Sequence, residues 1–191
     1  MRVTLALATA CALFSVPAFA QTPNPNTPSS NPLAATGART GAAAIGTQPG
    51  GTLSSRDFVN QVAIDNMFDV QAARLAEQKG DNPDKTFAKR EISHHDRATT
   101  ELKNLVMNKK VNAPVPTGLD SEYQQKIEAL QKMSGKQFDE AFSKDMIQSH
   151  RNEIALFDQY TKDGNNADLK HWASENLPEL REHLTNANKL S

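Results

Sequence analysis

The stretch that decides the fold runs from residue 83 to residue 110 and reads PDKTFAKREISHHDRATTELKNLVMNKK. Its apolar side chains, from Phe87 to Val106, recur at the three- and four-residue spacing of one helix face. Glu91 and His95 fall inside this apolar stripe and not opposite it, because a helix turns about 100° per residue. The segment therefore predicts a helix that carries titratable side chains on its buried face.

Helical periodicity continues on both sides of this segment. Gly80 and Gly164 follow periodic runs and are typical helix-ending residues, while Asn82 and Ser134 are expected to cap the helices that come after them. The expected helices are four long ones at about 55–79, 83–110, 135–162 and 166–189, and a short one at about 119–133. Two short turns and one long connection predict an all-α, ferritin-like four-helix bundle of two helical hairpins, with the short extra helix in the long connection.

The amino terminus has the features of a cleavable signal peptide over residues 1–20. Arg2 provides the positive start, residues 3–16 form an almost unbroken apolar run, and Ala18-Phe19-Ala20 is a small-x-small cleavage pattern. We therefore expect export to the periplasm, with cleavage after Ala20 and a mature chain that begins at Gln21.

Cys11 is the one cysteine of the chain, and it raises a second possibility for the amino terminus. A lipoprotein signal also uses a cysteine at its cleavage point, so lipidation of Cys11 is the alternative to its removal. The apolar region continues past Cys11 to Ala20, which favours cleavage after Ala20. The mature chain would then have no thiol, which excludes disulfides, thiolate ligands and cysteine nucleophiles.

The mature chain is expected to have two parts. Residues 21–53 are rich in Pro, Asn, Thr and Gly, with too few large apolar side chains to offset the entropy of ordering, so we expect a disordered tether. Residues 54–191 form the helical-bundle domain. The near-zero net charge and the lack of a Lys/Arg cluster argue against nucleic-acid binding, and no later segment is apolar enough to span a membrane. No feature identifies an envelope partner.

Six titratable side chains fall on or beside the inner faces of the predicted helices, at similar heights in the bundle. The first long helix has two possible inner faces, and Asp65 and Asp69 lie between them. The six residues are Asp69, Glu91, His95, His150, Glu153 and His183. Burying such groups without partners would cost several kcal/mol each, so they must pair, bind water or bind a metal.

Three interpretations of this cluster are open: a hydrogen-bonded network that fixes helix register, a bound transition metal, and a metal-free acid/base site. Carboxylates and imidazoles on facing helices are how carboxylate-bridged metal bundles hold their ions, although the Glu-x-x-His motif of those proteins is absent. Without thiolates, iron, manganese or zinc fits such a set better than copper(I).

The helical region also resembles a bacterial protein family. The residues that carry the resemblance are Phe58-Val59, Asn66 to Ala73, His95, His150-x-x-Glu153 and Leu177-Pro178-x-Leu180-Arg181-Glu182-His183-Leu184. Members of that family are labelled predicted outer-membrane or exported proteins of unknown function, and they are grouped with ferritin-like bundles. The resemblance implies this fold and export, but it implies no activity.

Two functional hypotheses follow. In the first, the protein is a periplasmic metal-binding bundle whose six central residues are ligands or support ligands. In the second, it is a non-enzymatic envelope or stress-associated protein, and the buried polar cluster is only structural. The first hypothesis requires nitrogen and oxygen atoms from at least three helices to lie within about 4–5 Å of a common point, because metal bonds to these atoms are 2.0–2.2 Å long.

Overall fold

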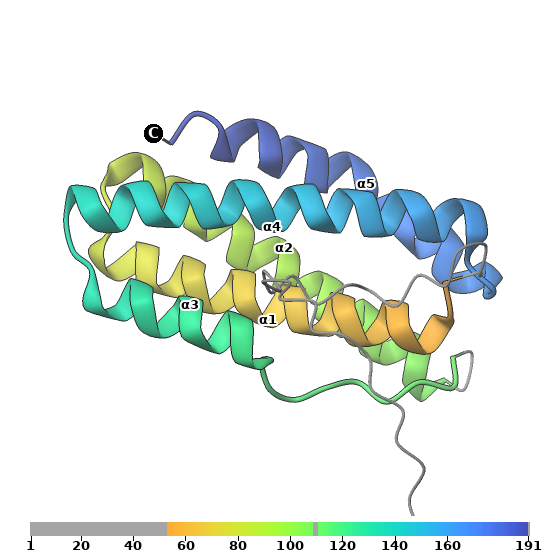
Figure 1. The fold of residues 1–191 in the computed structure, drawn as a ribbon. Coiled ribbons are helices and arrows are strands. Elements are labelled where there is room, and N and C mark those ends of the chain that lie inside the picture. Colours follow the sequence, from red (N-terminus) through yellow and green to blue (C-terminus); the bar gives the residue numbers. More distant parts are fainter. Residues whose placement is uncertain (1–52, 109–110, 191) are drawn as a thin grey trace, which may run out of the picture. The chain divides into compact units, whose positions relative to one another are not determined.

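The computed structural model describes residues 53–108 and 111–190, and within these ranges every regular element is an α-helix. The helices are α1 (Ser55–Lys79), α2 (Asn82–Met107), α3 (Ser121–Lys132), α4 (Lys136–Asp163) and α5 (Ala167–Ala187) (Figure 1). The predicted all-α helical bundle is confirmed, and every helix end lies within three residues of the expected one.

The four long helices form two hairpins, α1–α2 and α4–α5, as expected. The two hairpins pack together through α1 against α4 and α2 against α5, and neighbouring long helices run in opposite directions (Figure 1). Each hairpin turn begins with a glycine N–H that binds the last turn of the helix before it. Gly80 donates to the carbonyl of Ala76 over 2.9 Å, and Gly164 donates to the carbonyl of Tyr160 over 2.8 Å.

Helix α1 is buried on more than one side because it packs against α2, α4 and α3. Phe58 and Val62 belong to one apolar cluster, whereas Phe68 belongs to a second cluster that includes Ile127 of α3. Helix α3, which lies in the long connection between the hairpins, thus covers a second face of α1. Both apolar faces that the sequence of α1 indicated are therefore buried.

The helix starts differ in detail from the expected caps. Asp81 caps α2 by accepting a hydrogen bond from the backbone N–H of Asp84, so α2 begins with Asn82 instead of being capped by it. The prediction that Ser134 caps α4 is wrong. Gly135 is the cap residue, with a φ of 54°, and no side chain accepts a hydrogen bond there. A left-handed residue at this position suits glycine, which has no Cβ to clash.

The predicted signal peptide, Cys11 and residues 21–52 of the expected tether lie outside the described residues. Leu53, the last residue of that expected tether, is buried in the same apolar cluster as Phe58. Among the described helices, none is both long enough and apolar enough to cross a membrane.

Candidate metal centre

The six predicted site residues lie together in the middle of the bundle. None of them exposes more than 3% of its surface. All four long helices contribute: Asp69 from α1, Glu91 and His95 from α2, His150 and Glu153 from α4, and His183 from α5. Helical periodicity explains the pairs, because residues three or four positions apart project from the same face of a helix.

The six side chains form two overlapping sets of four. In each set, one nitrogen or oxygen atom from every residue lies within 4.8 Å of the corresponding atoms of the others. One set is Glu91, His95, His150 and His183, and the other is Asp69, His95, His150 and Glu153. This is the spacing that the metal hypothesis requires, with donors from three helices in each set.

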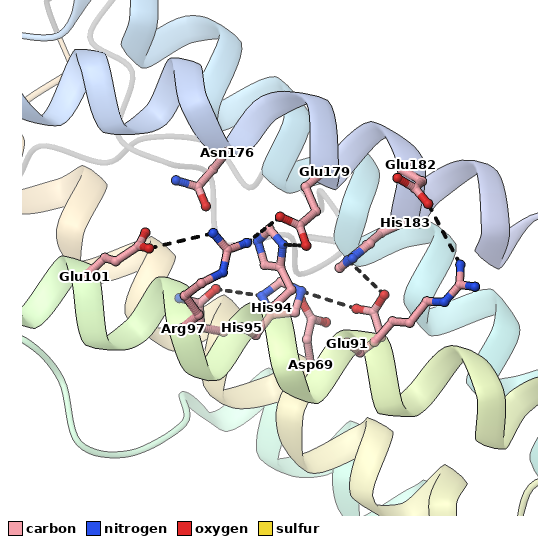
Figure 2. Close-up of polar contacts among 12 residues, drawn as sticks. Asp69, Glu91, His94, His95, Arg97, Glu101, Asn176, Glu179, Glu182 and His183 are labelled. Carbon is pink, nitrogen blue, oxygen red and sulfur yellow. Dashed lines mark hydrogen bonds and ion pairs between the residues drawn. The ribbon is translucent and has the colours of Figure 1, made fainter.

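The carboxylate of Glu91 lies between three imidazole rings. Its Oε2 is 3.2 Å from Nε2 of His95 and 3.1 Å from Nε2 of His150. Its Oε1 is 2.9 Å from Nδ1 of His183, as Figure 2 shows. Asp69 is near the same point, with its Oδ2 3.6 Å from Nε2 of His95.

Two of the rings are oriented by hydrogen bonds on their far side. His150 Nδ1 donates to the backbone carbonyl of Met146 over 2.8 Å. His95 Nδ1 lies 2.8 Å from Oδ1 of Asn66, and the amide of Asn66 is oriented because its Nδ2 donates to Thr99. Since both partner oxygens can only accept, each Nδ1 carries a hydrogen. In the neutral ring, Nε2 then presents its lone pair to the centre, as in most metal-ligating histidines.

The facing atoms of the centre form short contacts but not aligned hydrogen bonds. Both oxygens of Glu91 and of Asp69, and one oxygen of Glu153, have no hydrogen-bond partner among the described residues. The same holds for the three imidazole nitrogens that contact Glu91. Buried polar atoms are normally satisfied, so this concentration of exceptions at one point indicates a site for an additional group.

Glu91 and His150 shift each other's pKa in opposite directions. Burial raises the pKa of Glu91, but the charge of His150 and the contacts with the three imidazoles outweigh burial and hold that pKa well below its usual range. Burial lowers the pKa of His150, yet the charge of Glu91 raises it to about 9. Glu91 and His150 are therefore an ion pair at neutral pH.

Glu153 has the opposite shift. Burial, followed by repulsion from Asp69 and Asp65, raises its pKa well above the usual range, which favours the protonated form of its carboxyl. Burial also raises the pKa of Asp65 to about 7, although hydrogen bonds from Gln61 and Tyr123 oppose this. Because a ligand must be deprotonated, an ion that binds His150 would displace its proton.

A smaller polar cluster lies beside the centre, between α2 and α5. His94 Nδ1 is 2.8 Å from Oε1 of Glu179, and Arg97 binds the other carboxylate oxygen (Figure 2). His94 is buried, while the side chain of Glu179 is 41% exposed. Burial, together with repulsion from His95 and His183, lowers the pKa of His94 to about 4. His94 is therefore neutral at physiological pH.

Sequence reasoning did not identify Asn66, Thr99, His94 or Glu179 as site residues. One signal for Asn66 was available, because it precedes Asp69 by three residues and so shares its helix face. The contact between His94 and Glu179 had no such signal, because the two residues lie on different helices and are 85 positions apart in the sequence.

The donor atoms suit a divalent transition metal. Imidazole nitrogens and carboxylate oxygens bind iron, manganese and zinc, and no sulfur donor is present in the set. Nδ1 of both His95 and His150 is occupied, so each ring can bind one ion through Nε2. The six residues therefore suffice either for one ion with several ligands or for two ions that divide the set or share a bridging carboxylate.

The comparisons with known proteins agree with the family resemblance at a coarse level. No curated protein and no solved structure matches the chain significantly. A family model described as "Domain of unknown function (DUF4142)" matches residues 40–190, which includes all five helices. The match covers most of the chain, and the protein therefore belongs to the DUF4142 family of domains of unknown function.

Proposed function

We propose that this protein is an exported, periplasmic helical bundle that binds iron, manganese or zinc at the six-residue centre. The observation that carries the proposal is the orientation of His95 and His150. Their Nδ1 atoms are held by acceptors outside the centre, and their Nε2 atoms converge on a carboxylate without an aligned hydrogen bond. In the metal-free protein, a proton on Nε2 of His150 balances the charge of Glu91, and a divalent ion bound between these atoms would replace that proton.

The arrangement of the helices supports a ferritin-like relationship, because two hairpins joined by one long connection build their sites from side chains on facing helices. The signal-peptide pattern of residues 1–20 supports export. Mass spectrometry of a periplasmic fraction should find Gln21 at the amino terminus. A lipidated chain that begins at Cys11 would contradict this part of the proposal.

The metal is tested by elemental analysis of protein purified without an affinity tag, combined with thermal melting. Iron, manganese or zinc should be present in a near-integral ratio. A ligand that binds only the native state at a hundredfold excess over its Kd stabilises that state by about 2.7 kcal/mol, so chelation should lower Tm.

Variants identify the site. His95→Ala and His183→Ala should each abolish the metal-dependent rise in Tm. The matched control is His171→Ala, which removes an exposed histidine on the same helix as His183. If the parent protein is metal-free and its melting curve does not change with iron, manganese or zinc, the proposal of metal binding is wrong. The cluster is then a structural network in a non-enzymatic envelope protein.

A further inference from the structure

An open pocket lies on the surface of the bundle between α2 and α5. Its volume is about 740 Å³, and its lining includes His94, Arg97, Glu179 and His183. His183 is the member of the buried centre that lines this pocket. The ring of His183 therefore lies between the open pocket and the carboxylate of Glu91.

The pocket contains its own set of metal donors. One donor atom each from His94, Glu179 and His183 lies within 4.8 Å of the others. Two imidazoles and one carboxylate leave coordination positions open to water, which is the arrangement of zinc sites that exchange ligands. Because Glu179 is partly exposed, a hydrated ion can reach this set directly.

Arg97 opposes a cation at this position. Its guanidinium binds the Glu179 oxygen that does not contact His94, and it also lies 3.7 Å from Glu101 (Figure 2). Both partners of the Arg97–Glu179 pair are about half exposed, so solvent screens their attraction and the pair can open. Arg97 thus covers the outer set without closing it.

We propose that His94, Glu179 and His183 form an outer binding site for a hydrated divalent transition-metal ion, and that ions pass through it to the buried centre. This inference rests on the metal-binding function proposed above. An ion that entered the centre in one step would lose its hydration shell before it met a ligand. At the outer site it exchanges water for three protein ligands first, and His183 belongs to both sets.

Cobalt(II) is a suitable probe, because its visible absorption reports nitrogen and oxygen ligands. Stopped-flow mixing of chelator-treated protein with Co²⁺ should show a fast, weak phase at the outer site and a slow, tight phase at the centre. Glu179→Gln should remove the fast phase and slow the filling of the centre by roughly tenfold or more, with the final stoichiometry unchanged. Arg97→Gln should increase the amplitude of the fast phase and speed the filling of the centre.

The matched control is Glu182→Gln, which changes a carboxylate of the same pocket that pairs with Arg90 and is not in the donor set. It should leave both phases unchanged. If the tight phase is present but Glu179→Gln alters neither phase, the outer site is overturned and the central function stands. If the parent lacks the tight phase, the central function fails. In that case the outer site is also overturned if the parent has no fast phase, or if the fast phase of the parent persists in Glu179→Gln.

Discussion

Asn66 holds His95 in the tautomer that a metal ligand requires, although Asn66 itself is not expected to touch the ion. Replacing Asn66 with alanine removes the acceptor for His95 Nδ1. Loss of such a partner lowers metal affinity by about 10- to 100-fold in comparable sites. We expect this loss for Asn66→Ala with an unchanged stoichiometry, measured by competition with a chelator of known affinity. Asn152→Ala, on the exposed face of α4, should bind like the parent.

Asp65 makes the stability of the metal-free protein depend on pH. Its carboxyl accepts hydrogen bonds from Tyr123 and Gln61, and burial raises its pKa from 3.8 to about 7. Between these values the unfolded chain has released the proton and the folded chain still holds it. The free energy of unfolding therefore falls as pH rises from about 4 to 7, by up to about 1.4 kcal/mol per pH unit for this group.

Asp65→Asn should remove this dependence, because the amide oxygen still accepts the hydrogen bond from Tyr123 but does not titrate. Urea unfolding of the chelator-treated proteins at pH 5, 6 and 7 measures the difference. The variant should gain stability relative to the parent at each step up in pH. Parallel pH profiles for the two proteins would show that Asp65 is already ionised in the folded state.

Helical periodicity gave the direction of the five central side chains on α2, α4 and α5, and the distance from a turn gave their height, whereas on α1 periodicity left both Asp65 and Asp69 possible. The sequence was not sufficient for the hydrogen bonds that orient the rings. The contact of His95 with Asn66 depends on a side-chain rotamer and on the packing of α1 against α2. The bond from His150 to Met146 depends on the rotamer of the ring within one helix turn. Neither leaves a repeating pattern in the sequence.

At the level of elements, the turn between α4 and α5 requires glycine for reasons of space. A Cβ at Gly164 would lie 2.5 Å from the carbonyl oxygen of Tyr160 and 2.7 Å from its ring. Tyr160 is fully buried and stacks on Phe58, so it has no room to move. We expect Gly164→Ala to reduce the free energy of unfolding by about 1–3 kcal/mol, as overpacking does in other cores.

Gly118 provides the control for this substitution, because a Cβ there would have nothing within 4 Å. Gly118→Ala should be neutral or slightly stabilising, since it restricts the unfolded chain. Chemical denaturation of both variants measures the contrast. Equal effects at the two positions would show that the turn at Gly164 relaxes to accept a side chain.

The helix ends at Gly80 and Gly164 were predictable because a glycine follows a periodic segment. The start of α4 was not. Ser134 fits a capping pattern, but the cap residue is Gly135. Its φ is positive, and no side chain accepts a hydrogen bond at this helix start. The role of α3 was also beyond the sequence, because a short helix with one apolar stripe does not reveal which partner it covers.

For the whole molecule, Leu53 is the first of the described residues, and it belongs to the apolar core. Its side chain is 6% exposed and packs in the cluster that contains Val111 and Leu177. A chain that starts at Leu53 should melt within a few degrees of the chain that starts at Gln21. Leu53→Ala in the longer chain should cost about 2–5 kcal/mol, the usual range for a buried leucine. A large drop in Tm for the shorter chain would show that residues 21–52 stabilise the bundle.

Each hairpin supplies half of the central residues, and the two halves differ in composition. The α1–α2 hairpin brings two carboxylates and one imidazole, namely Asp69, Glu91 and His95, whereas the α4–α5 hairpin brings His150, Glu153 and His183. Two copies of the first hairpin would crowd four carboxylates around two imidazoles, and two copies of the second would crowd four imidazoles around two carboxylates. The unequal division of carboxylates and imidazoles therefore favours packing of the α1–α2 hairpin against the α4–α5 hairpin. Packing of two identical hairpins would bury an unbalanced set of charges.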